Sequence, residues 1–335
     1  MGQRMLKVAV VGAETLPGQD LLESLFDEDF PMETPSLFTV GDEEATASLE
    51  DEDVRILPLT RGALTDQDLV FVLPGARPEP GLLEEATRSG GIVLDASGQS
   101  KGAPLIFPGL NEEELEEHPD ERILALPSPL AAQLAAVLLP LDAKATVRSV
   151  EVVALEPAAA KGLEGLDELS QQTIDLLSGR EPGRKTFPYR LAFNLVPLVG
   201  RLETEGETDD ERVTLEELGR LFGREVEGSL VSAWVPLFHG TTLFLTVRTE
   251  RPLDREAART ALSEAEGVEI LDDPEHQVVP MPMLAVGDSR VHVGRIRRQG
   301  ESLHLISVAD GLRFGVASPL VGLAKELLKL GRFSA

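Results

Sequence analysis

The sequence predicts an α/β protein of two domains, in which a doubly wound parallel sheet is followed by an α+β domain with a large, mostly antiparallel sheet. Three observations support this prediction. The 335 residues are enough for about two domains. Short apolar runs alternate with helical patterns as far as about residue 140, as they do in parallel sheets. Beyond that point, longer strand patterns follow one another in pairs.

The first half opens with Leu6–Val11, a continuous apolar run typical of a buried parallel strand. A helical pattern follows over Leu16–Phe26, and another covers Pro80–Arg88. Because crossovers between parallel strands are right-handed, helices are expected on both faces of the sheet. Further strands are predicted at Ser36–Val40, Leu69–Leu73, Gly91–Leu94 and Ile123–Leu126.

The second half begins with a long strand candidate, Ala145–Leu155, and an amphipathic helix, Glu164–Leu177. Residues 201–212 are predicted to be a polar connection, and Val316–Leu330 a final helix. Two strand pairs are also predicted. These are Ser229–Phe238 with Thr241–Thr249, joined near His239 and Gly240, and Val291–Arg297 with Ser302–Val308, joined by a turn over Arg298–Glu301.

The composition excludes several classes of function. A net charge of −27 repels nucleic-acid phosphates. The absence of cysteine excludes disulfides, thiolate metal sites and a cysteine nucleophile. The apolar run near the N-terminus spans about six residues, too few for a membrane span or a signal sequence. We expect a cytoplasmic protein that binds neither nucleic acid nor a membrane. No metal is expected, because the five histidines form no ligand motif, and His292 and His304 would at most be an incidental cross-strand pair.

Six motifs lie in a consistent order between residues 12 and 318: GAETLPG (12–18), DASGQSK (95–101), FNLVP (193–197), WVPLFHG (234–240), VGRIR (293–297) and DGLRFGVAS (310–318). In order and spacing they resemble aspartate-semialdehyde dehydrogenases, particularly the USG-1-like branch. The resemblance implies a Rossmann-like dinucleotide-binding domain over residues 1–128 and a dimerisation and former substrate domain over residues 129–315. It also implies that a C-terminal helix (316–335) packs back on the first domain. NADP, a homodimer through the second domain's sheet and a role in amino-acid biosynthesis are implied as well. Fold alone does not determine function, so the function depends on how the residues of each site match the family pattern.

The loop that should hold the dinucleotide departs from the family pattern GATGxVG. Gly12, Ala13 and Gly18 fit it, but Thr15 replaces the middle glycine, and its Cβ takes space that the phosphate needs. Glu14 adds a carboxylate there. Glu14 either repels an anion, by an upper-end estimate of about 4 kcal/mol at about 4 Å, or caps the empty helix N-terminus itself. The acidic stretch 41–44 (GDEE) stands where the 2′-phosphate of NADP would bind.

The resemblance implies a nucleophilic cysteine in a motif like NPNCST. The matching stretch is Leu126–Leu130, and alignment on the shared proline places the cysteine at Pro129, whereas a one-residue gap places it at Ser128. Neither residue supplies a thiol. Ser128 would need a strong adjacent base to act as a nucleophile. Alternatively, Ser128 and Pro129 cap and start the following helix.

The resemblance implies a substrate-binding arginine and a catalytic histidine in a stretch like RVPVxxxH. Trp234 replaces the arginine and Thr241 replaces the histidine. His239 is a candidate substitute, because residues i and i+2 of a straight strand share a face. Gly240 lies between His239 and Thr241 and favours a turn instead.

Other substrate and cofactor positions have also changed. Lys101 replaces the phosphate-binding arginine and keeps a point charge without the bidentate fork. With Ser97 and Ser100 it forms a candidate anion-binding site. The stretch that matches the family's SGAG segment is Glu156–Ala159, and Gly311 replaces an amide-bearing residue that reaches the nicotinamide.

Because these changes affect every part of the implied site, we predict a non-catalytic homodimer with a binding or regulatory role, no cofactor and an unknown protein partner. One alternative is an NAD(P)-dependent oxidoreductase with altered chemistry, which would use Ser128, His239 and Lys101. The other is a small-molecule sensor that holds an anion at Lys101 in the former cleft.

Overall fold

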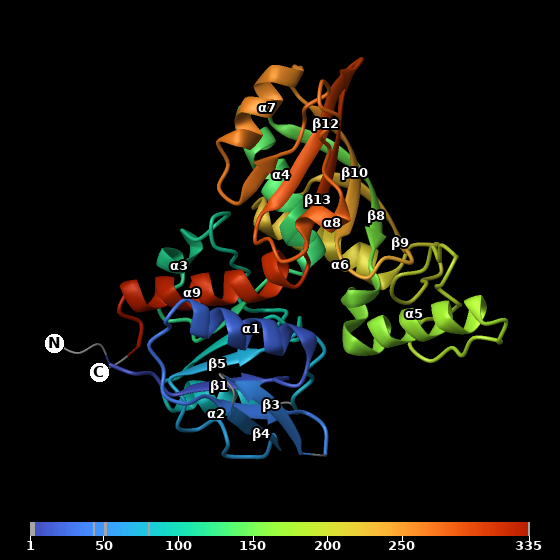
Figure 1. Cartoon of the computed structure of the whole chain (residues 1–335). Coiled ribbons are helices and arrows are strands. Elements are labelled where there is room, and N and C mark those ends of the chain that lie inside the picture. The colour runs from blue at the N-terminus through green and yellow to red at the C-terminus, as the bar shows by residue number, and fades with distance from the viewer. Residues whose placement is uncertain (1–3, 43, 50–51, 80, 334–335) are drawn as a thin grey trace. The chain divides into compact units, whose positions relative to one another are not determined.

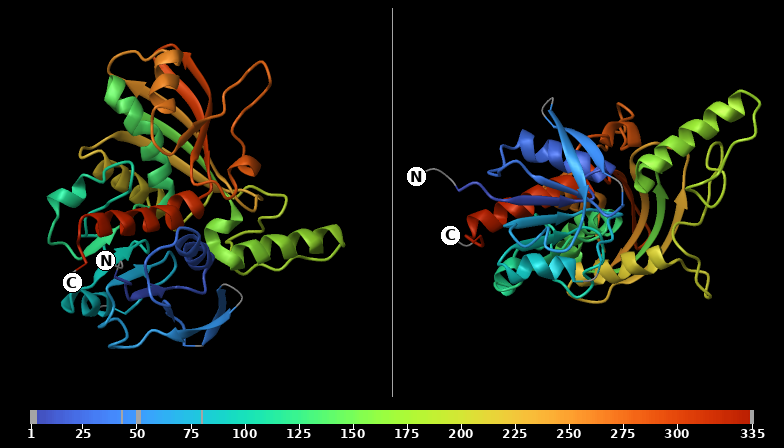
Figure 2. Two further views of the ribbon diagram at one scale, coloured as in Figure 1. Left: turned by 60° about the vertical axis from the view of Figure 1, so that its left-hand side comes forward. Right: turned by 90° about the horizontal axis from the view of Figure 1, so that it is seen from below.

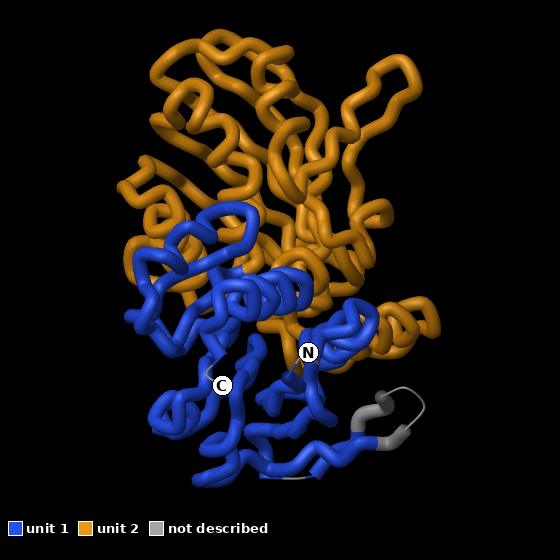
Figure 3. The backbone as a smooth tube through the Cα atoms, turned by 90° about the vertical axis from the view of Figure 1, so that its left-hand side faces the viewer, with its two compact units in different colours: residues 1–128, 316–335 blue, residues 129–315 orange. Residues whose placement is uncertain are grey.

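The computed structural model describes residues 4–42, 44–49, 52–79 and 81–333. The chain divides into two compact units (Figure 3). Unit 1 comprises residues 1–128 together with 316–335, and unit 2 comprises residues 129–315. The last segment of the chain therefore belongs to the same unit as the first. Within the described ranges, no helix is both long and apolar enough to cross a membrane.

Unit 1 is built on a seven-stranded sheet with the order β3-β4-β2-β1-β5-β6-β7. Neighbouring strands are parallel, except that β3 pairs with β4 in an antiparallel ladder at one edge. The runs predicted as buried strands form its centre, which confirms the α/β class with a mostly parallel sheet. The strands are β1 (Val8–Val11), β2 (Ser36–Thr39), β3 (Ala45–Leu49), β4 (Glu52–Pro58), β5 (Leu69–Val72), β6 (Ile92–Asp95) and β7 (Ile123–Ala125).

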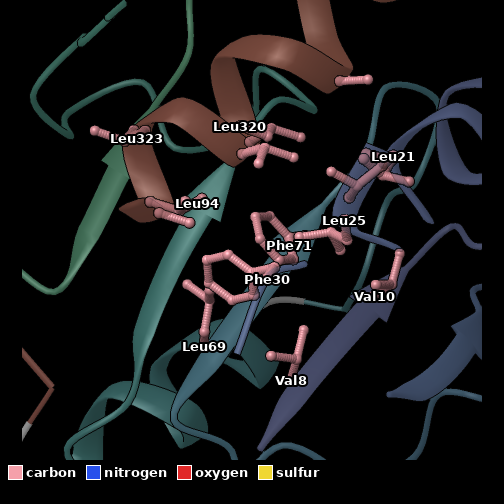
Figure 4. Packing of buried hydrophobic residues seen from close by; sticks show 14 of the residues in the cluster. Val8, Val10, Leu21, Leu25, Phe30, Leu69, Phe71, Leu94, Leu320 and Leu323 are labelled. Atoms are coloured by element: carbon pink, nitrogen blue, oxygen red, sulfur yellow. The ribbon is translucent and has the colours of Figure 1, made fainter. Parts of the chain in front are cut away.

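The sheet of unit 1 separates two apolar cores, because successive side chains of a strand point to opposite faces. Val8 and Val10 lie in one core, with α1 (Leu16–Asp27) and α9 (Ser318–Lys329). Ala9 and Val11 lie in the other, with α2 (Leu82–Arg88). The side chains labelled in the first core are Val8, Val10, Leu21, Leu25, Phe30, Leu69, Phe71, Leu94, Leu320 and Leu323 (Figure 4).

Unit 2 contains a six-stranded sheet with the order β11-β12-β13-β10-β8-β9. The β11–β12 and β8–β9 pairs are parallel and the other three are antiparallel. The prediction of a mostly antiparallel second sheet is thus confirmed. The strands are β8 (Val147–Glu156), β9 (Glu227–Trp234), β10 (Thr241–Thr249), β11 (Val268–Ile270), β12 (Val291–Gln299) and β13 (Ser302–Ala309).

The helices α4 (Pro129–Ala145), α6 (Asp209–Leu221) and α7 (Arg255–Ser263) contact this sheet and bury the inward side chains of its strands. The helix α5 (Gly162–Leu177) follows a 3₁₀ turn and extends away from the sheet as an arm (Figures 1 and 2). Two short helices, α3 (Glu114–Glu117) in unit 1 and α8 (Pro282–Ala285) in unit 2, lie within connections.

The opposite face of the second sheet exposes a row of apolar side chains. Val231 of β9 is in register with Val153 of β8, Val153 with Phe244 of β10, and Phe244 with Ile306 of β13. Phe244 is 44% exposed, Val153 47% and Val231 57%. This apolar row continues across four neighbouring strands, so it forms a contiguous patch, and patches of this kind commonly mark interaction sites.

Three details of the prediction are wrong. β9 and β10 were expected to pair with each other, but β8 lies between them because β9 joins the sheet edge in parallel with β8. Residues 201–212 are not wholly a connection, since α6 begins at Asp209 behind a capping box formed by Thr208 and Glu211. The edge strand β3 and its antiparallel neighbour β4 were not predicted.

Candidate functional site

The loop between β1 and α1 is closed by two hydrogen bonds of the Thr15 side chain. Thr15 is the N-cap of α1: its Oγ1 accepts from the Gly18 backbone N–H at 3.2 Å and donates to the Gly12 carbonyl oxygen at 2.7 Å. Gly12 has a φ of +89°, and a Cβ on Gly18 would lie 2.6 Å from the Gly12 carbonyl oxygen. Both glycines are therefore needed for the turn itself. A bound diphosphate would compete with the Thr15 hydroxyl for an amide of the helix N-terminus.

The expectation that Glu14 caps this helix is wrong, because the side chain directly before the first helical residue, Thr15, already does so. Glu14 Oε1 instead accepts a hydrogen bond from the Thr39 hydroxyl at the end of β2, at 2.7 Å. Its Oε2 is buried and has no hydrogen-bond partner among the described residues. Glu14 therefore ties the loop after β1 to β2 and leaves a carboxylate oxygen beside that loop.

The acidic stretch after β2 is exposed at Asp42 and Glu44, and Glu44 forms an ion pair with Arg55. Glu43 lies outside the described residues. The negative charges at the end of β2 thus face solvent rather than a buried cation.

Two of the three predicted anion-binding residues after β6, Ser97 and Ser100, bond to a carboxylate of the protein itself. Asp95 is fully buried, and its Oδ1 accepts from the Ser97 N–H at 2.7 Å and from the Ser97 hydroxyl at 2.6 Å. Its Oδ2 accepts from the Ser100 N–H at 2.9 Å. Lys101 is exposed. Asp95 therefore takes both donors of Ser97 and the backbone N–H of Ser100, so these donors are not free for an outside anion.

In unit 2, three of the altered positions come together. Pro129 is the first residue of α4, Thr241 begins β10, and Gly311 lies just after β13. A Cβ on Gly311 would be 3.7 Å from Pro129 Cβ and 3.8 Å from Thr241 Oγ1. A Cβ on Gly315 would be only 2.5 Å from Pro129 Cβ. The Pro129 ring therefore lies beside Gly311, the position of the implied nicotinamide contact, and Thr241, the position of the implied base, lies beside Gly311 as well. Ser128 is half-buried directly before it.

A buried polar chain continues from Thr241. Its hydroxyl donates to Glu156 Oε2 at 3.0 Å, and Glu156 is only 8% exposed. Burial raises the pKa of Glu156 to about 7, while the Thr241 hydrogen bond lowers it and the nearby charge of Asp210 raises it. Gln133 of α4 donates to the Ser307 hydroxyl at 2.9 Å and to the Thr241 carbonyl oxygen at 3.4 Å. The position of the implied histidine thus holds a hydroxyl bonded to a buried carboxyl group.

The position of the implied substrate arginine belongs to a separate small core. Trp234 is buried against Phe187 in an edge-to-face contact with the ring centroids 5.4 Å apart. The ammonium of Lys161 lies 5.2 Å from the Trp234 ring centroid. Trp234 therefore anchors the end of β9 and presents no charged group to a carboxylate.

His239 does not extend strand β10. It is half-buried, and the chain turns directly after it at Gly240, whose φ is +89°. β10 starts at Thr241, so the alternation that would place His239 and Thr241 on one face does not apply. The geometric basis for His239 as a substitute base is therefore absent.

Some important side chains were not predicted from the sequence. Gln133 is the single polar residue in the apolar run AAQLAAVLL, and it is buried. A polar residue inside such a run indicates a buried hydrogen-bonded group, and this signal was missed. Asp310, the first residue of the motif at 310–318, has a structural role, because its carboxylate accepts from the backbone N–H groups of Gly287 at 2.8 Å and Leu312 at 3.0 Å.

The histidines also differ from expectation. His292 is in register with Val308, and His304 with Arg297, so the two do not face each other. His292 Nε2 instead lies 2.9 Å from Asp288 and 3.3 Å from Glu269, so that three residues of metal-ligating type come together without a sequence motif. The guanidinium of Arg290 already bridges both carboxylates, with 2.9 Å contacts to each. Arg290 and His292 therefore share the charges of the two carboxylates in one ion network.

Replacing Gly315 with alanine is expected to destabilise the chain by about 1–3 kcal/mol, because the added methyl group overlaps Pro129 in a packed interior. Gly322→Ala in α9 is the matched control, since its Cβ would meet Pro108 at an ordinary 3.5 Å. Urea unfolding of both variants tests this. Equal stability of Gly315→Ala and the wild type would show that Pro129 does not occupy this position.

Comparison with known proteins agrees with the two units. A family model described as semialdehyde dehydrogenase, dimerisation domain, matches residues 138–314. A USG-1 protein homologue of Azotobacter vinelandii is 30% identical over 98% of this chain and 99% of its own. Aspartate semialdehyde dehydrogenase II of Vibrio cholerae has a TM-score of 0.90 at 25% identity, covering 97% of this chain and 99% of its own. A Candida albicans aspartate semialdehyde dehydrogenase solved with NADP shares the fold, with a TM-score of 0.74 at 18% identity, covering 98% of this chain and 99% of its own.

A mostly parallel sheet in one unit and a mostly antiparallel sheet in the other are the fold of two-domain semialdehyde dehydrogenases. The chain belongs to the aspartate-semialdehyde dehydrogenase family, and the resemblance read from its motifs is confirmed.

Proposed function

We propose that this chain is a non-catalytic, homodimeric member of its family with a binding or regulatory role. The observation that carries the proposal is the convergence of Pro129, Thr241 and Gly311 at one place in unit 2. We assign the implied nucleophile to Pro129, because its ring faces the other two positions. A proline has no nucleophile, and the chain contains no cysteine to replace it.

The proposal includes the loss of tight dinucleotide binding. The family relative from Candida albicans was solved with NADP. In this chain the Thr15 hydroxyl caps α1, and Glu14 leaves a buried carboxylate oxygen beside the same loop. A phosphate would have to displace the Thr15 hydroxyl and approach the Glu14 carboxylate. Like charges at a low-dielectric site repel strongly. These residues do not fit a diphosphate.

We further propose that two copies pair through the open face of the second sheet. The apolar row of Val231, Val153, Phe244 and Ile306 supports this, because it lies on the face away from α4, α6 and α7. The family model that covers this region is described as a dimerisation domain. A contiguous patch across four strands suits a twofold interface, in which the same surface contributes from both subunits.

A turnover assay tests the loss of catalysis. With aspartate semialdehyde, phosphate and NADP, the purified chain is expected to form NADPH no faster than a protein-free solution, while an active relative run in parallel does. Turnover that co-elutes with this chain and disappears in Ser128→Ala would overturn the proposal and assign the nucleophile to Ser128.

A further inference from the structure

A basic segment stands out in this acidic chain. Residues 182–202, called here the basic loop, contain four cationic residues and no acidic residue, whereas the whole chain has 31 cationic and 58 acidic residues. The loop therefore carries a charge of about +4 on a protein with a net charge of −27. It follows α5 and leads to α6, beside the end of β9 (Figure 1).

Three of its cations have no carboxylate partner in the described part of the chain. Arg184, Lys185 and Arg190 are exposed and form no ion pair there, whereas Arg201 pairs with Glu203. Arg184 donates only to the Pro188 carbonyl oxygen, at 2.9 Å. The protein has about two acidic residues for each basic one. Three cations without an ion pair in one loop therefore indicate that the loop binds acidic groups of another molecule.

The basic loop also presents aromatic side chains to solvent. Tyr189, the single tyrosine of the chain, is 57% exposed, and Phe193 is 65% exposed. Phe193 has a φ of +56°, which is uncommon for a bulky residue and persists only where the surroundings fix it. Exposed aromatics beside arginines have the composition of an interface core.

The surroundings hold the loop in place before any partner binds. The Glu168 carboxylate of α5 accepts the backbone N–H groups of Lys185, at 2.8 Å, and of Thr186. The buried Gln172 accepts those of Leu191 and Ala192 at 2.9 Å and 3.0 Å. Such a preorganised surface loses little conformational entropy on association.

The loop is continuous with the open face of the second sheet. Val196 pairs with Trp234 at the end of the edge strand β9, and Val231 of the same strand begins the apolar row. A partner seated on that face is therefore beside the loop. Because two copies of this chain are proposed to pair through that face, the acidic partner of the loop is a second copy of this chain.

We infer that the basic loop of each subunit binds the acidic surface of the other subunit and offsets the repulsion between two bodies that each carry a charge of −27. This inference rests on the proposed homodimer. The apolar row supplies an attraction that salt does not screen, whereas the loop supplies one that acts at low ionic strength. The two contributions can be separated by their salt dependence.

The test is the dimer dissociation constant, measured by sedimentation at about 0.01 M and about 1 M salt, where the Debye length falls from about 30 Å to about 3 Å. The variant is Arg184→Glu, Lys185→Glu and Arg190→Glu together. The matched control is Arg61→Glu, Arg77→Glu and Arg88→Glu. It changes the net charge equally at exposed residues of unit 1 that form no ion pair in the described part of the chain.

The loop variant is expected to dimerise at least about tenfold more weakly than the control at low salt, and equally well at high salt. Equal constants for the two variants at low salt, or a deficit that persists at high salt, would overturn the inference. Phe244→Glu distinguishes the underlying proposal: if it leaves the dimer intact, the sheet interface is wrong whatever the loop does. A wild-type chain that stays monomeric would overturn both.

Discussion

Replacing Phe244 with glutamate is expected to convert the dimer into monomers. Phe244 lies in the middle of the apolar row, with Val153 on one side and Ile306 on the other. The substitution would bury one unpaired carboxylate from each subunit against that row. An uncompensated buried charge costs about 3–5 kcal/mol, and the dimer would bury two of them, so the dissociation constant should rise by at least about ten-thousandfold.

Sedimentation of the wild type and of Phe244→Glu measures this directly. Met5→Glu is the control, because Met5 is a similarly exposed apolar residue of unit 1, outside the sheet. The control is expected to remain dimeric. Val153→Glu should behave like Phe244→Glu, since the two residues are in register on the same face. Dimers that persist in both sheet variants would mean that the subunits associate through another surface.

Replacing Glu156 with glutamine is expected to stabilise the chain at alkaline pH. Glu156 is buried, and its pKa is raised from 4.5 to about 7, first because burial disfavours the charged form. A glutamine side chain at this position would keep a partner for the Thr241 hydroxyl and would remove the charge. At about 1.4 kcal/mol for each pKa unit, the gain in the free energy of unfolding is about 3 kcal/mol above pH 7.

The direction of the pH dependence follows from proton binding. Between pH 4.5 and about 7 the folded chain holds a proton on Glu156 that the unfolded chain has released. The Glu156 contribution to stability is therefore present at low pH and is lost as the pH rises to about 7. Above that value the contribution is constant.

Urea unfolding at several pH values between about 5 and 8 checks this, with the difference between Glu156→Gln and the wild type as the readout. That difference should grow as the pH rises, because Glu156 of the wild type loses its proton while the glutamine stays neutral. The other titrating groups are common to both proteins, so their effects cancel in the difference. Glu151→Gln on the same strand is the control: Glu151 is exposed and paired with Arg248, so little change is expected at any pH. A constant difference would place the Glu156 carboxyl group in contact with water.

The elements predicted most accurately are those with strong local patterns. The buried strands β1, β5 and β6 are continuous apolar runs, and such runs depend little on the rest of the chain. β3, at the edge of the sheet, and its neighbour β4 were missed, because their pairing with each other is not visible in the local composition. α6 was missed although Thr208 and Glu211 formed a legible capping box before it.

The candidate site was predictable only in part. The motifs located Pro129, Thr241 and Trp234 through family resemblance, not through any pattern of their own. The bond between Thr241 and Glu156 joins residues 85 positions apart, and no periodicity of the sequence implies it. The capping role of Thr15 required the actual turn of the loop, because Glu14 and Thr15 are adjacent and both carry acceptor oxygens.

Calorimetric titration of the purified dimer with NADP, and separately with NAD, tests most directly whether the scaffold has lost its chemistry. Stoichiometry in such a titration is insensitive to traces of a contaminating host enzyme. No heat of binding is expected up to about millimolar nucleotide, which corresponds to a binding free energy weaker than about −4 kcal/mol. Binding of one nucleotide per chain with micromolar affinity would contradict the interpretation of Glu14 and Thr15, and with it the claim that this family member no longer uses its dinucleotide site.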